Sequence, residues 1–152
     1  MANSRVLFDR VRPRAAGGYM SGHSKNVLSF FDNMCQRERP LIWFSTISAD
    51  GTPNLVPTCF LKPYDTNKIG CVFIKQTVEN VKRDKHVSLA SVRFSEGYDG
   101  YMIKGIGEVF DTSEIFDVIK KAVNEASKGK RTIFSVIIVT IHSVYSLKTY
   151  NR

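Results

Sequence analysis

The chain has 152 residues and a formal net charge of +8, with 43% hydrophobic and 24% charged residues. These values are ordinary for one globular domain and exclude a wholly disordered chain. No stretch is long and apolar enough for a membrane helix, and the N-terminus lacks the apolar segment of a secretory signal. We therefore expect a cytoplasmic protein that does not act in a membrane.

The three cysteines, Cys35, Cys59 and Cys71, are odd in number and show no C-x-x-C spacing. This pattern indicates neither a disulfide framework nor a zinc ribbon, and it favours a reducing compartment. Cys59 lies in an apolar stretch, so we expect a small buried side chain there rather than a reactive thiol.

The positive charge is spread over three separate places, namely the N-terminal segment, residues 82–85 and residues 128–131. Because no recognisable nucleic-acid-binding motif accompanies it, we interpret it as solvated charge on loops and helix ends, and nucleic-acid binding is disfavoured. The three histidines lack metal-ligand spacing, and the chain has no Gly-x-Ser-x-Gly elbow. The sequence thus predicts neither a metal site nor hydrolytic catalysis.

Residues 1–22 mix arginine, glycine and proline with little periodicity, which predicts an irregular N-terminal arm. The domain itself is then expected over residues 23–152. Apolar residues recur at helical spacing after Ser24, a plausible N-cap, and predict a helix over residues 24–36.

Three strands are predicted next. Residues 41–48 are rich in β-branched and aromatic side chains and precede the Asp50-Gly51 turn signal. Apolar runs follow at residues 54–61 and 69–74. Because the connections have hairpin length, the three strands form an antiparallel meander.

The second half of the chain continues this alternation of strands and helices. Gly105 and Gly107 fall inside one predicted strand and indicate a bulge or a tight bend. The predicted elements are a short helix at 77–84, strands at 87–94 and 101–110, a helix from Asp111 to about Gly129, and a strand at 133–141 continued at 144–147.

This order of elements predicts a mainly β (α+β) fold, in which an antiparallel barrel carries helices on its outside. The chain has neither a Gly-x-Gly-x-x-Gly fingerprint nor a Gly-x-x-x-x-Gly-Lys loop. Dinucleotide-binding and P-loop folds are therefore disfavoured.

One junction has the chemistry of an anion site. Between Ile74 and Asn80 a strand ends in a cationic, hydroxyl-bearing turn and a helix begins. The first turn of a helix has unpaired N–H groups and a partial positive charge, and Lys75 would add to it. Thr77 could cap the helix or donate to a ligand. Taken alone, the pattern favours an ordinary capped helix with a surface lysine over a phosphate site.

Four stretches, residues 50–58, 69–77, 79–87 and 101–105, together resemble the pyridoxamine 5'-phosphate oxidase-related family of FMN-binding split β-barrels, above all its small FMN-binding proteins. The resemblance runs from about Leu41 to Leu147. It implies an antiparallel split β-barrel with flanking helices, and a homodimer with the flavin at the subunit interface. The arginine- and histidine-containing substrate motif of the oxidase itself has no counterpart here, so we do not expect oxidation of pyridoxamine 5'-phosphate.

The resemblance also implies which residues bind FMN, whereas the catalytic residues stay unknown. The family often has a basic side chain where Gln76 stands, which places more weight on Lys75 as the phosphate ligand. By matching position, the candidates are Pro57, Thr58, Cys59, Val72, Phe73 and Ile74 near the isoalloxazine ring, Lys75, Gln76, Thr77 and Asn80 around the ribityl phosphate, and Leu147 reaching the ring from the partner subunit.

We therefore expect a dimeric flavoprotein in which FMN performs the redox chemistry and the polypeptide supplies position, dryness and hydrogen bonds. One alternative is a flavin or small-molecule reductase that uses a nicotinamide or deazaflavin donor. Another is a non-enzymatic basic barrel that binds nucleic acid or haem. The substrate and the electron donor stay open.

Overall fold

The residues that the structure describes form one antiparallel sheet of nine strands. The structure, a computed structural model, describes residues 6–9, 25–94 and 97–149. The strands are β1 (Val6–Asp9), β2 (Asn33–Met34), β3 (Leu41–Ile47), β4 (Pro53–Thr58), β5 (Phe60–Pro63), β6 (Lys68–Cys71), β7 (His86–Phe94), β8 (Tyr98–Phe110) and β9 (Val136–Thr149), and the helices are α1 (Lys25–Ser29), α2 (Lys75–Arg83) and α3 (Glu114–Ala126).

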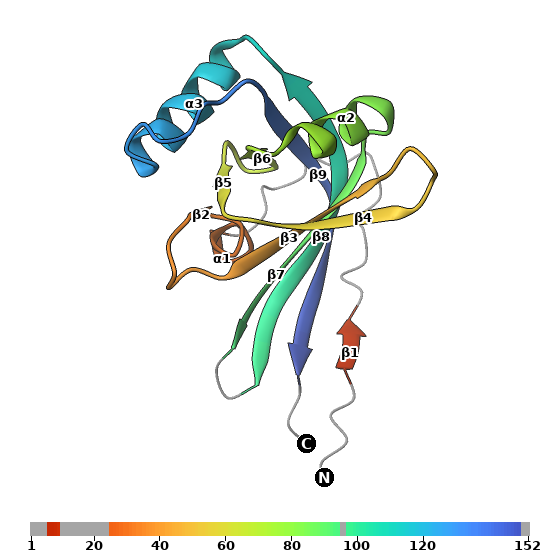
Figure 1. Ribbon diagram of the computed structural model, residues 1–152. Coiled ribbons are helices and arrows are strands. Elements are labelled where there is room, and N and C mark those ends of the chain that lie inside the picture. Colours follow the sequence, from red (N-terminus) through yellow and green to blue (C-terminus); the bar gives the residue numbers. More distant parts are fainter. Residues whose placement is uncertain (1–5, 10–24, 95–96, 150–152) are drawn as a thin grey trace.

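Neighbouring strands follow the order β2-β5-β6-β9-β8-β7-β3-β4, and β1 pairs with β9 outside this path. The sheet curls into a half-barrel, with α2 and α3 at one end (Figure 1). The β7–β8 hairpin reaches away from these helices at the other end. The predicted antiparallel split barrel with flanking helices is confirmed. None of the helices within residues 25–94 and 97–149 is long and apolar enough to cross a membrane.

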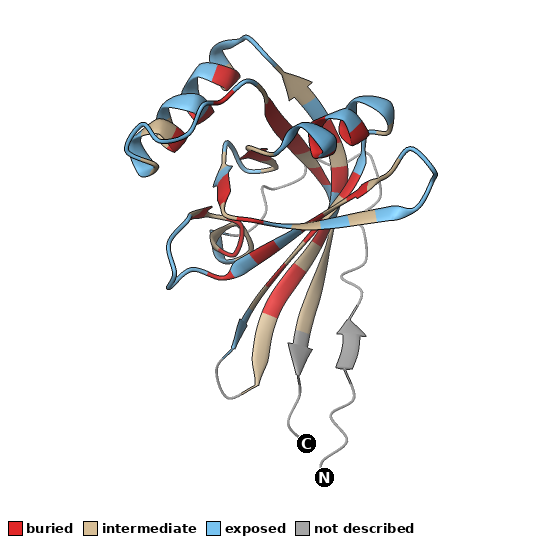
Figure 2. Cartoon of the chain, in the orientation of Figure 1, coloured by how far each residue is buried: buried red, intermediate tan, exposed pale blue. Residues whose placement is uncertain are grey.

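The sequence of β9 is almost continuously apolar because both faces of this strand are buried. Successive side chains of a strand point to opposite faces. Ile137 and Val139 join the core inside the barrel, whereas Val136 and Ile138 join a second core beneath α3. Figure 2 shows this stretch as a mainly buried band. Both faces of the strand are therefore covered, and neither can be polar.

The two larger helices, α2 and α3, each pack against a different hydrophobic core. Inside the barrel, aromatic side chains such as Phe31 and Phe44 pack with Val78 and Val81 of α2. Under α3, Ile119 lies so close to β6 that a Cβ atom on Gly70 would strike its side chain. Helix α2 thus covers one end of the barrel, and α3 covers the outside of the sheet.

Strand β6 and helix α2 meet earlier than the apolar pattern predicts. The strand ends at Cys71 rather than at residue 74, and α2 begins at Lys75 rather than at residue 77. The prediction extended the strand to Ile74 because this residue is apolar, but its side chain is 63% exposed and lies outside the strand. An apolar side chain before a helix reads as strand when only the sequence is known.

The predicted helix over residues 24–36 is wrong in its length. Helix α1 ends at Ser29, and Asn33 and Met34 pair with β5 as strand β2. Asn33 stabilises the change of direction, because its side chain donates to the carbonyl of Pro40 at 3.1 Å and accepts from the backbone N–H of Gln36 at 2.9 Å. Ser24, the predicted N-cap, lies outside the described residues.

The prediction that residues 1–22 form an irregular arm is wrong for one short segment, which is a strand. Val6–Asp9 forms β1 and pairs antiparallel with the last residues of β9. The remainder of the predicted arm, up to residue 22, lies outside the described residues.

Two further local predictions have clear outcomes. The ladder between β8 and β9 shifts register between Lys104 and Gly105, which confirms the predicted bulge. Helix α3 begins after Ser113, whose hydroxyl accepts from the N–H of Phe116 at 3.2 Å, and not after Asp111. Asp111 instead accepts a hydrogen bond from the hydroxyl of Ser135 at 2.6 Å.

Candidate functional site

The first turn of α2 is open to an anion. Ile74 occupies the N-cap position, no side chain of the described residues caps the helix, and its first turn contains no acidic residue. The N–H groups of this turn therefore keep their partial positive charge. Lys75 is the first residue of the helix and is exposed.

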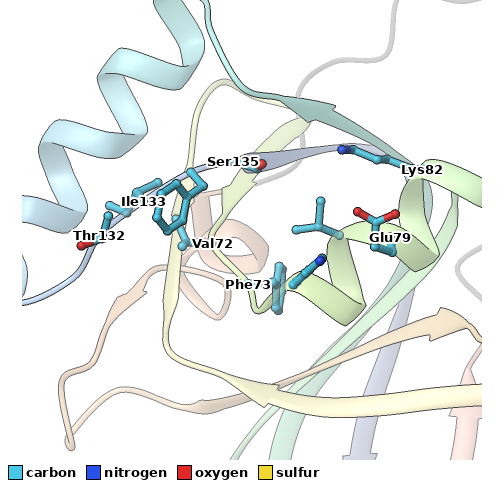
Figure 3. Close-up of a pocket in the computed structure, with 10 residues that line it drawn as sticks. Val72, Phe73, Glu79, Lys82, Thr132, Ile133 and Ser135 are labelled. Carbon is cyan, nitrogen blue, oxygen red and sulfur yellow. The ribbon is translucent and has the colours of Figure 1, made fainter.

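A cavity of about 340 Å³ lies beside this helix (Figure 3). Its size falls within the range of small-molecule sites. One wall is a single face of α2, because its residues follow the helical spacing i, i+3, i+4 and i+7. These residues are Lys75, Val78, Glu79 and Lys82, and the facing walls consist of Val72, Phe73, Thr132, Ile133, Phe134 and Ser135.

The cavity combines apolar walls with ionisable groups. In Figure 3 the side chains of Glu79 and Lys82 extend from α2 on one side, and Val72 and Ile133 lie on the other. The cavity is lined by the ammonium groups of Lys75 and Lys82 and the carboxylate of Glu79, which together give it a formal charge of +1. Such a cavity suits an anion that also carries an apolar or aromatic body.

Thr77 is fully buried, and its hydroxyl has no hydrogen-bond partner among the described residues. Buried hydroxyl groups without a partner are rare and cost about 1–3 kcal/mol. The hydroxyl lies in the same first turn of α2 as the uncapped N–H groups. Thr77 itself does not line the cavity, so this hydroxyl lies on the buried side of the turn.

Asn80 has a different environment from Lys75. It is buried, and its amide donates to the hydroxyl of Thr46 at 3.0 Å while its carbonyl oxygen accepts from Arg83 at 2.9 Å. Arg83 donates also to the backbone carbonyl of Ile47 at 2.7 Å. These bonds fasten α2 to β3, and Asn80 does not line the cavity.

Three of the predicted ring-binding residues, Pro57, Thr58 and Cys59, lie at or just after the end of β4, and Cys59 belongs to a disulfide that the sequence did not predict. Pro57 is exposed and Thr58 is buried. Cys59 forms a disulfide with Cys35, so the expectation of a free, buried thiol at position 59 is wrong. The physical reason is that β2 pairs with β5 and brings the two cysteines together across 24 residues of chain, which spacing alone does not reveal.

The structure thus gathers some of the predicted residues and separates others. Val72, Phe73 and Lys75 line the cavity, whereas Gln76 and Ile74 are exposed beside it. Leu147 is half-buried on β9, opposite Gly100 of β8. The predictions for these residues as FMN ligands stay predictions.

Sequence reasoning missed Glu79, Lys82 and the segment at residues 132–135. Glu79 and Lys82 could have been found, because they lie four and seven residues after Lys75 on one helical face. The segment at 132–135 could not, because it enters the site only through the packing of α3 and β9.

No protein-family model matches the chain. The uncharacterised protein MJ0282 of Methanocaldococcus jannaschii is 24% identical over 116 residues, which cover 74% of this chain and 76% of that protein. This relative carries no functional description.

Solved structures share the fold. HupZ from Group A Streptococcus has a TM-score of 0.64 at 16% identity, over 84% of this chain and 98% of that one. An FMN-binding protein from Syntrophomonas wolfei has a TM-score of 0.64 at 16% identity, over 72% and 78%. A candidate pyridoxamine 5'-phosphate oxidase from Lactobacillus delbrueckii has a TM-score of 0.60 at 19% identity, over 81% and 93%. At these identities the likeness establishes the fold and leaves the function open.

Proposed function

We propose that this chain, which has the split-barrel fold of FMN-binding and pyridoxamine 5'-phosphate oxidase-like proteins, is a flavin-binding redox protein with FMN as its cofactor. The observation that carries the proposal is the cavity beside the uncapped first turn of α2, with apolar walls and two lysines. FMN combines an aromatic ring system with a phosphate, and such a cavity offers a surface to each part.

The residues present fit this cofactor. Lys75 and the N–H groups of the first turn of α2 would receive the phosphate. Thr77, whose hydroxyl has no hydrogen-bond partner in the part of the chain that the structure describes, belongs to the same turn but does not line the cavity. Val72 and Phe73 would pack against the ring. The polar side of the cavity, with Glu79, would accept hydrogen bonds from the ribityl hydroxyls.

When bound, FMN supplies the one- and two-electron redox chemistry, and the polypeptide binds, orients and shields it. Lys75 would neutralise charge on the phosphate, while Phe73 and Ile133 would keep water from the ring. No acid or base of the chain is required for these tasks.

We also propose that the protein is a homodimer formed through the outer face of the sheet. Trp43 and Leu55 are 40% and 60% exposed on β3 and β4, where large apolar side chains call for an explanation. Directly opposed residues of antiparallel strands share a face. The pairings Leu41↔Val92, Val92↔Gly100 and Gly100↔Leu147 therefore place Leu147 on the same face as Leu41.

The test is direct binding. The purified protein is titrated with FMN and with riboflavin, binding is followed by quenching of flavin fluorescence, and gel filtration with light scattering gives the mass of the complex. We expect FMN to elute with a dimer and to bind at least about tenfold more tightly than riboflavin, because only FMN offers a phosphate. A protein that fails to retain FMN contradicts the proposed function, and a monomer that retains it contradicts only the dimer.

The same sample separates the reductase alternative. Anaerobic addition of a reduced nicotinamide cofactor or a reduced deazaflavin to the FMN complex bleaches the flavin absorbance if one of these is the donor. Rapid bleaching would assign the chain to the reductases, and no bleaching with either donor would remove this alternative.

A further inference from the structure

The two ends of the strand path come together at one corner of the half-barrel, which we call the closing corner, and a disulfide fastens this corner. Strands β2 and β4 are the two ends of the strand path, and no ladder joins them within the described strands. The chain crosses from β4 to β5 through Cys59, and β2 pairs with β5 beside this crossing. The disulfide between Cys35 and Cys59 therefore ties the segment after β2 to the end of β4.

The two cysteines are placed to form this bond. Their Cα atoms are 4.6 Å apart, and the backbone N–H of Cys35 donates to the carbonyl oxygen of Cys59 at 2.8 Å. Cα separations of this size are within the range of protein disulfides. The backbone contact does not depend on the sulfur atoms, so the pair stays aligned when the bond is reduced.

Access differs between the three cysteines. Cys35 is exposed and Cys59 is half-buried, so a small molecule can reach this pair from solvent. Cys71 is fully buried, and burial raises the pKa of its thiol far above the usual range. Chemistry with external thiols is therefore confined to the pair.

We propose that Cys35 and Cys59 form a reversible thiol–disulfide site that exchanges with low-molecular-weight disulfides of the glutathione type. Exposed protein disulfides are in general the labile, regulatory or catalytic ones, and Cys35 is exposed. The exchange sets whether the closing corner of the barrel is covalently fixed.

The exchange balances in two steps. A thiolate of the pair attacks the external disulfide, a mixed disulfide forms, and one glutathione thiolate leaves. The second protein thiolate then attacks the mixed disulfide, the Cys35–Cys59 bond forms, and a second glutathione thiolate leaves. Two electrons pass from the protein to the external disulfide, and the two protons of the protein thiols go to the released thiolates or to water.

The consequence for the flavin rests on the proposed function. Pro57 and Thr58 immediately precede Cys59, and the family resemblance places all three near the ring. A covalent tie at Cys59 holds this end of β4 in place before the ligand arrives, and such preorganisation favours binding. We expect the oxidised protein to bind FMN about threefold to tenfold more tightly than the reduced protein.

The experiment equilibrates the full chain in glutathione buffers of graded potential, traps free thiols by alkylation and locates them by mass spectrometry. FMN affinity is measured on the same samples by fluorescence quenching. Cys35→Ser removes the tie at an exposed position and is compared with reduced wild type, while Cys71 serves as the internal control that stays unlabelled under native conditions.

Each outcome decides a separate point. Three results together support the proposal. Cys35 and Cys59 are protected from alkylation together, and this protection appears and disappears with the potential of the buffer. FMN affinity changes with it, and Cys35→Ser binds FMN like reduced wild type. Thiols that stay free in every buffer, or a bond that glutathione never reduces in the folded protein, overturns the exchange. A cycling pair with unchanged FMN affinity overturns the link to the site, whereas a cycling pair with no FMN binding in either state contradicts the proposed function and leaves the exchange standing.

Discussion

The side-chain amide of Asn80 in α2 donates a 3.0 Å hydrogen bond to the hydroxyl oxygen of Thr46 in β3, and both residues are buried. The carbonyl oxygen of Asn80 is at the same time an acceptor for Arg83. The helix that bounds the candidate site is thus attached to the barrel through polar contacts as well as through the apolar Val78 and Val81. This attachment decides where the first turn of the helix points.

Replacement of Asn80 tests this attachment. Asn80→Ala leaves the buried hydroxyl of Thr46 without its closest donor, and we expect it to lower the free energy of unfolding by about 1–3 kcal/mol. Asn54→Ala is the control, because Asn54 reaches the same hydroxyl only at 3.5 Å. Urea unfolding followed by Trp43 fluorescence measures both. Equal stability of Asn80→Ala and wild type would contradict a structural role for Asn80.

Replacement of the two cavity lysines tests their part in phosphate binding. We expect Lys75→Gln to weaken FMN binding about tenfold and Lys82→Gln by a smaller factor, because Lys75 also adjoins the helix N-terminus. Lys68→Gln, on β6 and outside the cavity, should leave the affinity unchanged. Riboflavin serves as the ligand control, since its affinity should not depend on Lys75. A parallel loss for riboflavin would place the effect elsewhere than at the phosphate.

Gly105 and Gly107 lie two residues apart on β8 but differ in what an added methyl group would meet. A Cβ atom at Gly105 would strike the backbone carbonyl oxygen of Thr140, which cannot rotate away, whereas at Gly107 it would meet side-chain atoms of Val81 at 2.9 Å. We expect Gly105→Ala to cost about 3 kcal/mol or more and Gly107→Ala about 1 kcal/mol. Thermal unfolding of the two variants provides the comparison. The reverse order of stabilities would show that the bulge can relax.

Asp84, at the C-terminal end of α2, predicts a pH dependence of stability. The N–H of His86 donates to this carboxylate at 3.0 Å and the imidazole lies 2.7 Å away, and these bonds lower the pKa of Asp84 in the folded chain. The pKa of Asp84 is lower in the folded chain than in the unfolded chain. Asp84 therefore stabilises the fold fully at pH values above the ordinary aspartate range, and this stabilisation is lost as the pH falls through the folded pKa. Urea midpoints of wild type and Asp84→Ala should therefore differ at neutral pH and converge in acid. A difference that is constant with pH would contradict this origin.

The sequence predictions are accurate where a feature depends only on neighbouring residues and inaccurate where it depends on distant ones. The hairpin at Asp50-Gly51 and the bulge at Gly105 were predictable, because a turn or a kink depends on the residues that form it. The helix over residues 24–36 was overestimated, because the apolar spacing of Phe30 and Phe31 satisfies a helix as well as the turn in which they pack. Strand β2 exists only because β5 offers it a partner.

The same distinction applies to the candidate site. Its helix-borne part, from Lys75 to Lys82, follows from spacing along one helical face. Its opposite wall at residues 132–135 and the pairing of Cys35 with Cys59 join residues that are far apart in the chain, and no local pattern encodes such contacts.

Local signals gave most of the longer strands and helices, the barrel class and the cationic turn that opens α2, because propensity, periodicity and turn chemistry act over a few neighbouring residues. They missed β1 and β2, and they gave one strand at residues 54–61 where β4 and β5 are separate. No local signal gave the side chains that surround the cavity, the contact of Asn80 with Thr46, or the meeting of two cysteines at the closing corner. These depend on how a curled sheet brings distant strands together, and that geometry is set by burial of the whole core at once.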